Sequence, residues 1–158
     1  MRIFVMFGTQ DKRFDRLLHA ILASSVLKSH EVHVQLGYTK GNYEGIHYQE
    51  YYAEDELIEQ IRQADAIITH AGVGSIVSAL KLRKKTIVVP RLGKYKEQNN
   101  DHQVQIMERF ASEGYIIPVV DEKLLDKAIE GLQDFEPKEY QTGKQNIMET
   151  IDKFIASI

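Results

Sequence analysis

Residues 68–90 read ITHAGVGSIVSALKLRKKTIVVP. The stretch begins at the end of an apolar strand (66–69), continues through a helical pattern and finishes in a second apolar strand (86–90). A strand, a helix and a strand in this order predict a β-α-β unit whose two strands are parallel neighbours in one sheet. The turn between the first strand and the helix carries four residues suited to ligand binding: His70, Gly72, Gly74 and Ser75.

The same alternation of strands and helices extends along the rest of the chain. Apolar runs predict strands at 2–7, 31–37, 46–51, 66–69, 86–90 and 115–119. Helical spacing of apolar residues predicts helices at 12–28, 53–65, 75–84, 102–112 and 121–131, and a terminal helix at about 143–158. We therefore expect an α/β fold over residues 1–158, a single domain with a Rossmann-like parallel sheet and helices on both faces.

Composition narrows the class of protein. The net charge of −3 provides no basic excess for neutralising phosphates, so we expect no nucleic-acid partner. The chain has no cysteine, which excludes disulfides and thiolate metal sites. The apolar runs are too short for a membrane span, and the first residues read as a buried strand rather than a secretory signal. These features indicate a cytosolic domain.

The turn at residues 70–75 has the composition of an anion site. Gly72 and Gly74 allow a ligand close to the main chain, and the amides of residues 74–76 are expected to be free donors at the positive end of a helix. Ser75 either caps that helix or binds a phosphate oxygen, and His70 donates to the same anion. The alternative is a tight turn with Ser75 as its cap and a structural histidine.

Two further loops follow predicted strands and so lie at the edge where parallel sheets bind ligands. The first is FGTQD at 7–11, which lacks the G-x-G-x-x-G pattern of dinucleotide folds, and the chain also has no Walker lysine motif. The second, at 90–103, ends in amides, a carboxylate and a histidine that suit sugar hydroxyls: Asn100, Asp101, His102 and Gln103. Each loop also admits a plain structural interpretation, an ordinary turn or a solvated loop with a helix cap.

Taken together, these stretches resemble the glycosyltransferase family 28 carboxy-terminal domain, the donor-binding half of a GT-B enzyme. The residues that carry the resemblance are FGTQ at 7–10, ADAIITHAGVGS at 64–75 and P-R-x-x-K-Y-x-E-x-x-N-D-H-Q at 90–103. The resemblance covers residues 1 to about 120. It extends to the small catalytic subunits of split UDP-sugar transferases, of the bacterial exopolysaccharide and capsule type or the dolichol-pathway type.

The resemblance implies a site for a UDP-sugar donor. Gly8 and Thr9 would face the diphosphate, and His70 would be the catalytic residue that contacts it. The other residues implied in substrate binding are Gly72, Gly74 and Ser75 at the pyrophosphate, Tyr51 and Tyr52 near the uracil, and Asn100, Asp101, His102 and Gln103 at the sugar. The family commonly has a glutamate that grips the ribose on the helix after the glycine turn, whereas this chain has Ser78 there.

The resemblance also implies partners. A GT-B enzyme needs a second domain, which in split enzymes is a membrane-anchored subunit that supplies the half for a lipid-linked sugar acceptor. The chain would then be cytoplasmic and held at the inner face of the membrane by that partner. No cofactor is expected, and no metal, because no D-x-D motif occurs. The remaining surface or structural histidines are His19, His30, His33 and His47.

Two other functions remain open at this point. One is a non-catalytic subunit that binds a nucleotide sugar or stabilises a partner, for which Ser78 is the motivating residue. The other is a hydrolase or epimerase of nucleotide sugars, which would act without a partner or a lipid.

Overall fold

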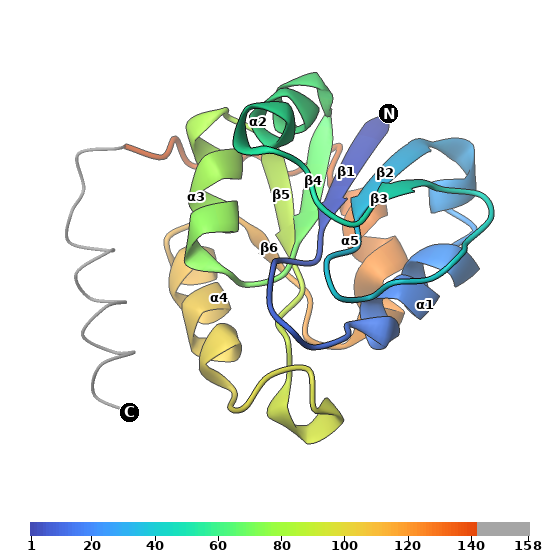
Figure 1. Cartoon of the computed structure of the whole chain (residues 1–158). Helices are drawn as coiled ribbons and strands as arrows, with labels where there is room; N and C mark the ends of the chain where they lie inside the picture. Colours follow the sequence, from blue (N-terminus) through green and yellow to red (C-terminus); the bar gives the residue numbers. More distant parts are fainter. Residues whose placement is uncertain (142–158) are drawn as a thin grey trace.

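The computed structural model describes residues 1–141. Its centre is a sheet of six strands in the order β3-β2-β1-β4-β5-β6, and every pair of neighbours is parallel (Figure 1). The strands are β1 (Arg2–Met6), β2 (Glu31–Gln35), β3 (His47–Gln49), β4 (Ala66–Thr69), β5 (Lys85–Val88) and β6 (Ile117–Pro118). The predicted parallel sheet is confirmed, whereas the helix expected at about 143–158 lies outside the described residues.

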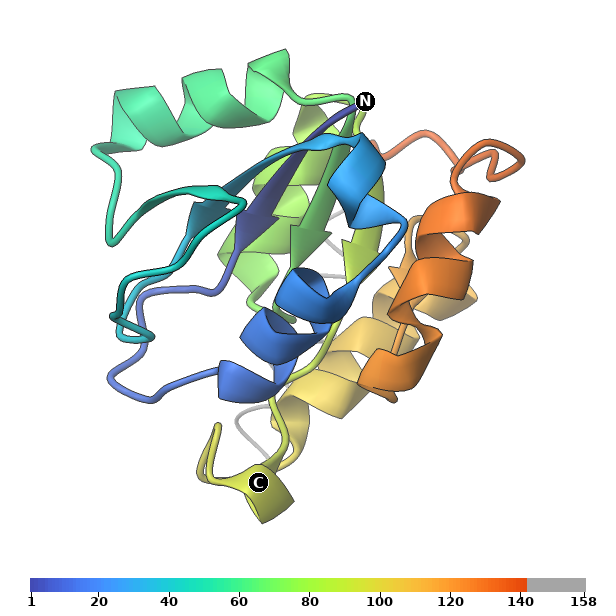
Figure 2. The same cartoon turned by 90° about the vertical axis from the view of Figure 1, so that its right-hand side faces the viewer.

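Helices cover both faces of the sheet, as the sequence predicts (Figure 2). On one face lie α1 (Asp15–Ala23) and α5 (Leu125–Gly131), and on the other α2 (Glu54–Gln63), α3 (Val73–Lys81) and α4 (His102–Ser112). Three short 3-10 turns complete the elements: η1 (Leu27–Ser29), η2 (Gly93–Tyr95) and η3 (Glu122–Leu124). Among residues 1–141, no helix has the length and apolar character that crossing a bilayer requires.

The alternation of side chains along β1 explains why both faces are covered. Ile3 and Val5 belong to the core beneath α1 and α5, whereas Phe4 and Met6 belong to the core beneath α2 and α3. A strand that is apolar on both faces must bury both, and parallel strands joined through helices satisfy this requirement.

The helix predicted at 12–28 is shorter in the structure, because α1 ends at Ala23. The Ser24 hydroxyl accepts the backbone N–H of Leu27 at 3.0 Å and also donates to Asp126. A serine side chain that satisfies a nearby backbone donor competes with helix continuation, and the chain turns here into η1. The predicted helix at 121–131 likewise divides, into η3 and α5.

The sheet brings three predicted loops to one edge. The strands β1, β4 and β5 are neighbours and run in the same direction, so the segments that follow them lie together at their carboxyl ends (Figure 1). We call this the carboxyl edge. It holds the start of α3 and the long segment from Pro90 to Asp101.

Candidate functional site

His70 lies at the centre of the carboxyl edge, directly after β4, and only 5% of its surface is exposed. Its backbone N–H donates to Met6 O at 3.0 Å, which ties it to the end of β1. A Cβ added to Gly8 would stand 2.6 Å from the imidazole, and one added to Gly72 would also collide with it. These two glycines therefore make room for the histidine ring itself, and Gly8 has in addition a φ of +88°.

Gln103, in the first turn of α4, fixes the tautomer of His70. Its Oε1 accepts the backbone N–H groups of Ala71 at 3.1 Å and Arg91 at 2.9 Å, which leaves the amide nitrogen facing His70 Nδ1 at 3.3 Å. A side-chain amide nitrogen can only donate, so Nδ1 must accept and the ring proton must sit on Nε2. His70 thus presents an N–H donor at its other nitrogen.

The imidazole remains neutral near pH 7. Burial, together with the nearby Arg91 cation, lowers the pKa of His70 to about 3. Its Nδ1 lone pair already accepts the Gln103 hydrogen bond, and its Nε2–H donates to the Ser75 hydroxyl oxygen at 3.4 Å. His70 is therefore a fixed neutral hydrogen-bond donor and is poorly suited to accepting a proton.

The start of α3 lies beside this donor. The helix begins at Val73, and its first backbone bond runs from Ile76 N to Gly72 O at 3.0 Å. The amides that precede this bond are those of Val73, Gly74 and Ser75, so the expectation of free donors at 74–76 is wrong by one residue. The interpretation of Ser75 as helix cap is also wrong, because Gly72 occupies that position.

Gly74 is the glycine of this turn that leaves space open. A Cβ added there would meet no atom within 4 Å, in contrast to Gly72, whose Cβ direction is filled by the His70 ring. Free amides, the positive end of the helix dipole and the His70 Nε2–H thus lie together, and all of them favour negative charge. This part of the carboxyl edge can hold a phosphate-like group.

Two hydrogen bonds within the 90–103 segment hold its polar end in place. Asn100 Oδ1 accepts the His102 backbone N–H at 3.0 Å, and Asp101 Oδ1 accepts the Gly93 N–H at 2.8 Å. Asn100 and Asp101 are exposed and His102 is half-buried, while Gln103 is buried with its amide directed to His70. Sugar contact stays a prediction for all four residues, and Gln103 acts here in addition as a positioning residue.

The predicted nucleotide contacts on the other loops differ in how far their side chains are exposed. Thr9 is exposed in the turn after β1. The Tyr52 ring is half-buried and packs edge-on against Phe4 with centroids 5.6 Å apart, and Tyr51 beside it is exposed. The tyrosine pair therefore combines a packed ring with a free one, and its role near a base stays a prediction.

Arg91 is the residue of this region that the sequence analysis missed. Its side chain is fully buried, donates to Phe7 O at 2.6 Å, Lys12 O at 2.9 Å and Glu97 O at 3.1 Å, and lies over the Phe14 ring. Burial lowers the pKa of Arg91 to about 10. The guanidinium joins the segment after β1 to the segment after β5. A cation directly behind an apolar strand was the available signal for this role.

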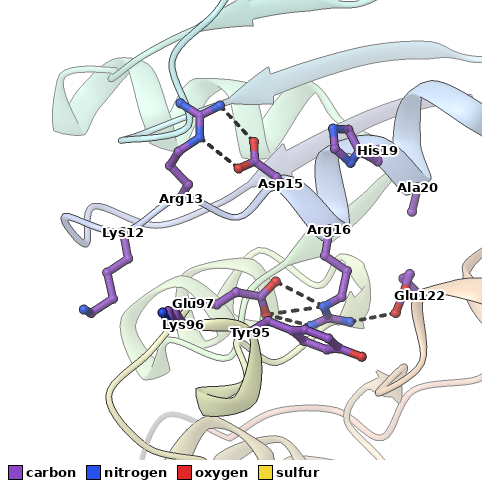
Figure 3. Close-up of a pocket in the computed structure, with 10 residues that line it drawn as sticks. All are labelled: Lys12, Arg13, Asp15, Arg16, His19, Ala20, Tyr95, Lys96, Glu97 and Glu122. Carbon is purple, nitrogen blue, oxygen red and sulfur yellow. Dashed lines mark hydrogen bonds and ion pairs between the residues drawn. The ribbon is translucent and has the colours of Figure 1, made fainter.

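Glu97 and Arg16 continue this buried polar network. They form an ion pair at 3.0 Å with 4% and 8% of their side chains exposed, and Arg16 also contacts Glu122 at 3.1 Å (Figure 3). Both Arg16 and Glu97 line a cavity of about 740 Å³ between α1, η2 and η3. Arg91 connects this ion pair to the carboxyl edge, because its guanidinium donates to Glu97 O.

Known proteins support this fold and family. The chain is 29% identical over 126 residues to the UDP-N-acetylglucosamine transferase subunit ALG13 of Mus musculus, which covers 73% of this chain and 10% of the relative. It is 43% identical over 56 residues to the protein of that name from Candida glabrata, covering 35% of this chain and 26% of the relative. The chain thus spans about a tenth to a quarter of these relatives.

Solved structures share the architecture. The solution structure of ALG13 superposes with a TM-score of 0.63 at 19% identity, covering 96% of this chain and 97% of that one. The glycotransferase of kitacinnamycin superposes with a TM-score of 0.62 at 16% identity, and covers 99% of this chain but 39% of its own. This chain therefore shares its fold with the whole of the solved ALG13 structure and with one part of the kitacinnamycin glycotransferase. Its sequence matches the glycosyltransferase family 28 C-terminal domain over residues 2–158, and the chain belongs to that family.

Proposed function

We propose that this chain is the donor-binding, catalytic subunit of a two-component inverting glycosyltransferase. It would move a sugar from a UDP-sugar to a lipid-linked acceptor in polysaccharide biosynthesis. The observation that carries the proposal is the convergence of neutral donors on one spot, namely the free amides at the start of α3 and the Ser75 hydroxyl, which accepts from the His70 Nε2–H and keeps its own proton to donate. Such a set of donors suits the diphosphate of a nucleotide sugar.

These donors have a direct role in the reaction. Breaking the bond between the sugar and UDP builds negative charge on the departing diphosphate. Donors that are already fixed in place stabilise this charge without reorganising, an effect often worth about 3 kcal/mol for each donor. Gln103 keeps the His70 proton on Nε2 throughout, so His70 would act on the leaving group through the Ser75 hydroxyl that accepts this proton.

The acceptor hydroxyl must lose a proton, and His70 is not the group that takes it. Its low pKa and occupied Nδ1 disfavour proton uptake. We assign the general base to the partner subunit, which would be membrane-anchored and would supply the acceptor half. The chain would then act in the cytoplasm, at the inner face of the membrane, through that partner.

The relatives suggest the first donor to test. Their name describes subunits of a UDP-N-acetylglucosamine transferase, and this supports both the two-component arrangement and N-acetylglucosamine as the donor sugar. Asn100, Asp101 and His102 would read the sugar hydroxyls from the end of the 90–103 segment. Thr9 and Tyr52 would contact the diphosphate and the uracil.

Calorimetric titration of the full chain with UDP and UDP-N-acetylglucosamine tests donor binding. We expect binding to the wild type and its loss in Ser75→Tyr, because the larger ring would fill the space beside the His70 Nε2–H. Ser25→Tyr is the matched control, since Ser25 is exposed in the turn after α1. Absence of heat from the wild type, with and without its partner, would count against the proposal.

A non-catalytic binding subunit is the second candidate. It is favoured by Ser78, which stands on α3 where the family commonly has a ribose-binding glutamate. Sugar transfer by the reconstituted pair distinguishes the two. A catalytic subunit loses activity on the order of 10²-fold in His70→Ala, whereas a stabilising subunit keeps it once the variant is shown to fold. Turnover of free UDP-sugar by the isolated chain would instead indicate a hydrolase or epimerase.

A further inference from the structure

We propose that Glu31, His33 and His47 form a binding site for a divalent transition metal such as Zn²⁺. The site follows from the register of two parallel strands. His33 on β2 is the direct partner of His47 on β3, and Glu31 precedes His33 by two residues. Residues two apart on a strand point to the same face, so the three side chains share one patch of the sheet surface.

The side chains are already close to one another. One ligand atom from each of the three lies within 4.8 Å of the others, and the two imidazole rings stack with centroids 4.6 Å apart. His33 Nε2 lies 2.7 Å from Glu31 Oε1. Ligands of a tetrahedral zinc ion, each about 2 Å from the metal, are about 3.3 Å apart. Glu31 and His47 are exposed, so their side chains have room to rotate toward an ion shared with His33.

The chemistry of the three ligands selects the metal. Two imidazoles and a carboxylate suit Zn²⁺ and its neighbours rather than Mg²⁺ or Ca²⁺, and three protein ligands leave a coordination position for water. Arg2 Nη1 contacts Glu31 Oε1 at 3.3 Å, and this cation opposes a second positive charge nearby. The other carboxylate oxygen of Glu31, Oε2, accepts no hydrogen bond from residues 1–141. We therefore expect micromolar affinity, weaker than that of a closed structural zinc site.

The position of the site indicates what the metal would do. Glu31 and His47 are the first residues of β2 and β3, so the site is distant from the carboxyl edge and separate from the transfer chemistry. β3 has only three residues and is an edge strand. A metal bound by ligands from both β2 and β3 would hold β3 against the rest of the sheet. It would also hold the segment that leads from β3 to Tyr51 and Tyr52. Because binding requires the folded register, it would also stabilise the fold.

Zn²⁺ binding to the full chain, treated with chelator and then dialysed, tests the proposal. We expect one equivalent to bind by calorimetry and the midpoint of thermal unfolding to rise with Zn²⁺. Loss of one ligand, in His33→Gln or His47→Gln, should weaken binding at least about tenfold, or about 1.4 kcal/mol. His19→Gln is the matched control, because His19 lies on α1, on the opposite side of the sheet, and should bind Zn²⁺ as the wild type does.

Co²⁺ provides an independent readout, because its visible absorption changes when protein side chains coordinate it. We expect this absorption change in the wild type and its loss in His47→Gln. Glu31→Gln, a surface change, keeps the test available if a histidine variant unfolds, and should also weaken binding. The proposal is wrong if the wild type binds no Zn²⁺ at about 1 mM. It is equally wrong if His33→Gln, His47→Gln and Glu31→Gln all bind as tightly as the wild type.

Discussion

Gln103 donates its side-chain amide to His70 Nδ1 at 3.3 Å, and this single contact determines which nitrogen of the histidine carries the proton. The two residues are 33 positions apart in the sequence and lie on different elements, the start of α4 and the end of β4. The contact turns a residue type known for proton transfer into a fixed neutral donor. It follows that Gln103 contributes to the site by orienting His70.

Replacing Gln103 by Glu tests this relationship. The carboxylate keeps an acceptor for Ala71 N and Arg91 N but has no donor for His70. The ring must then place a proton on Nδ1, as the other tautomer or as the imidazolium. Nitrogen-15 NMR of the imidazole should show protonation only at Nε2 in the wild type and at Nδ1 in Gln103→Glu. The exposed Gln105→Glu is the control, and an unchanged His70 spectrum in Gln103→Glu would contradict the assignment.

The buried histidine should make the fold sensitive to acid. The pKa of His70 falls from 6.5 in the unfolded chain to about 3 in the fold, so between these values the unfolded state binds the extra proton. The wild type should therefore lose about 2 kcal/mol of unfolding free energy between pH 7 and pH 5 relative to His70→Gln. Chemical denaturation of both proteins across this range measures the difference. Parallel pH profiles would show that His70 titrates normally.

Arg91 should be among the most important single residues for stability. Removing its guanidinium in Arg91→Leu leaves the carbonyls of Phe7, Lys12 and Glu97 without their donor. We expect a loss of about 4 kcal/mol of unfolding free energy, measured by urea denaturation. Arg62→Leu is the control, because its exposed pair with Glu59 should contribute less than about 1 kcal/mol. Equal losses in the two variants would refute the role assigned to Arg91.

The ion pair between Arg16 and Glu97 provides a further test. Glu97→Gln keeps an acceptor for the Leu92 backbone N–H but removes the charge that neutralises Arg16 in a nearly buried setting. We expect destabilisation by about 3 kcal/mol that persists at high salt, because buried charges are weakly screened. Glu59→Gln, which alters an exposed pair, should have a small effect that salt removes. Denaturation at two salt concentrations separates the two behaviours.

Much of the architecture could be predicted from the sequence because it depends on neighbours along the chain. The continuous apolar run in β1 and the helical spacing in α1 and α2 each reflect burial of one local face, and their order implies a parallel sheet. Element ends were less predictable. The Ser24 side chain ended α1 early, and the third strand, expected at 46–51, extends only over His47–Gln49.

By itself, the sequence determined the α/β alternation, the family and the candidate anion site around His70. The tertiary structure alone decided the protonation of His70, the burial of Arg91 and the meeting of His33 with His47. The physical reason is that burial and hydrogen bonding join residues far apart in the chain, 84 positions for Arg91 and Phe7. Periodicity reports only which face of an element is apolar, whereas the partner that a polar side chain finds there depends on how the elements pack.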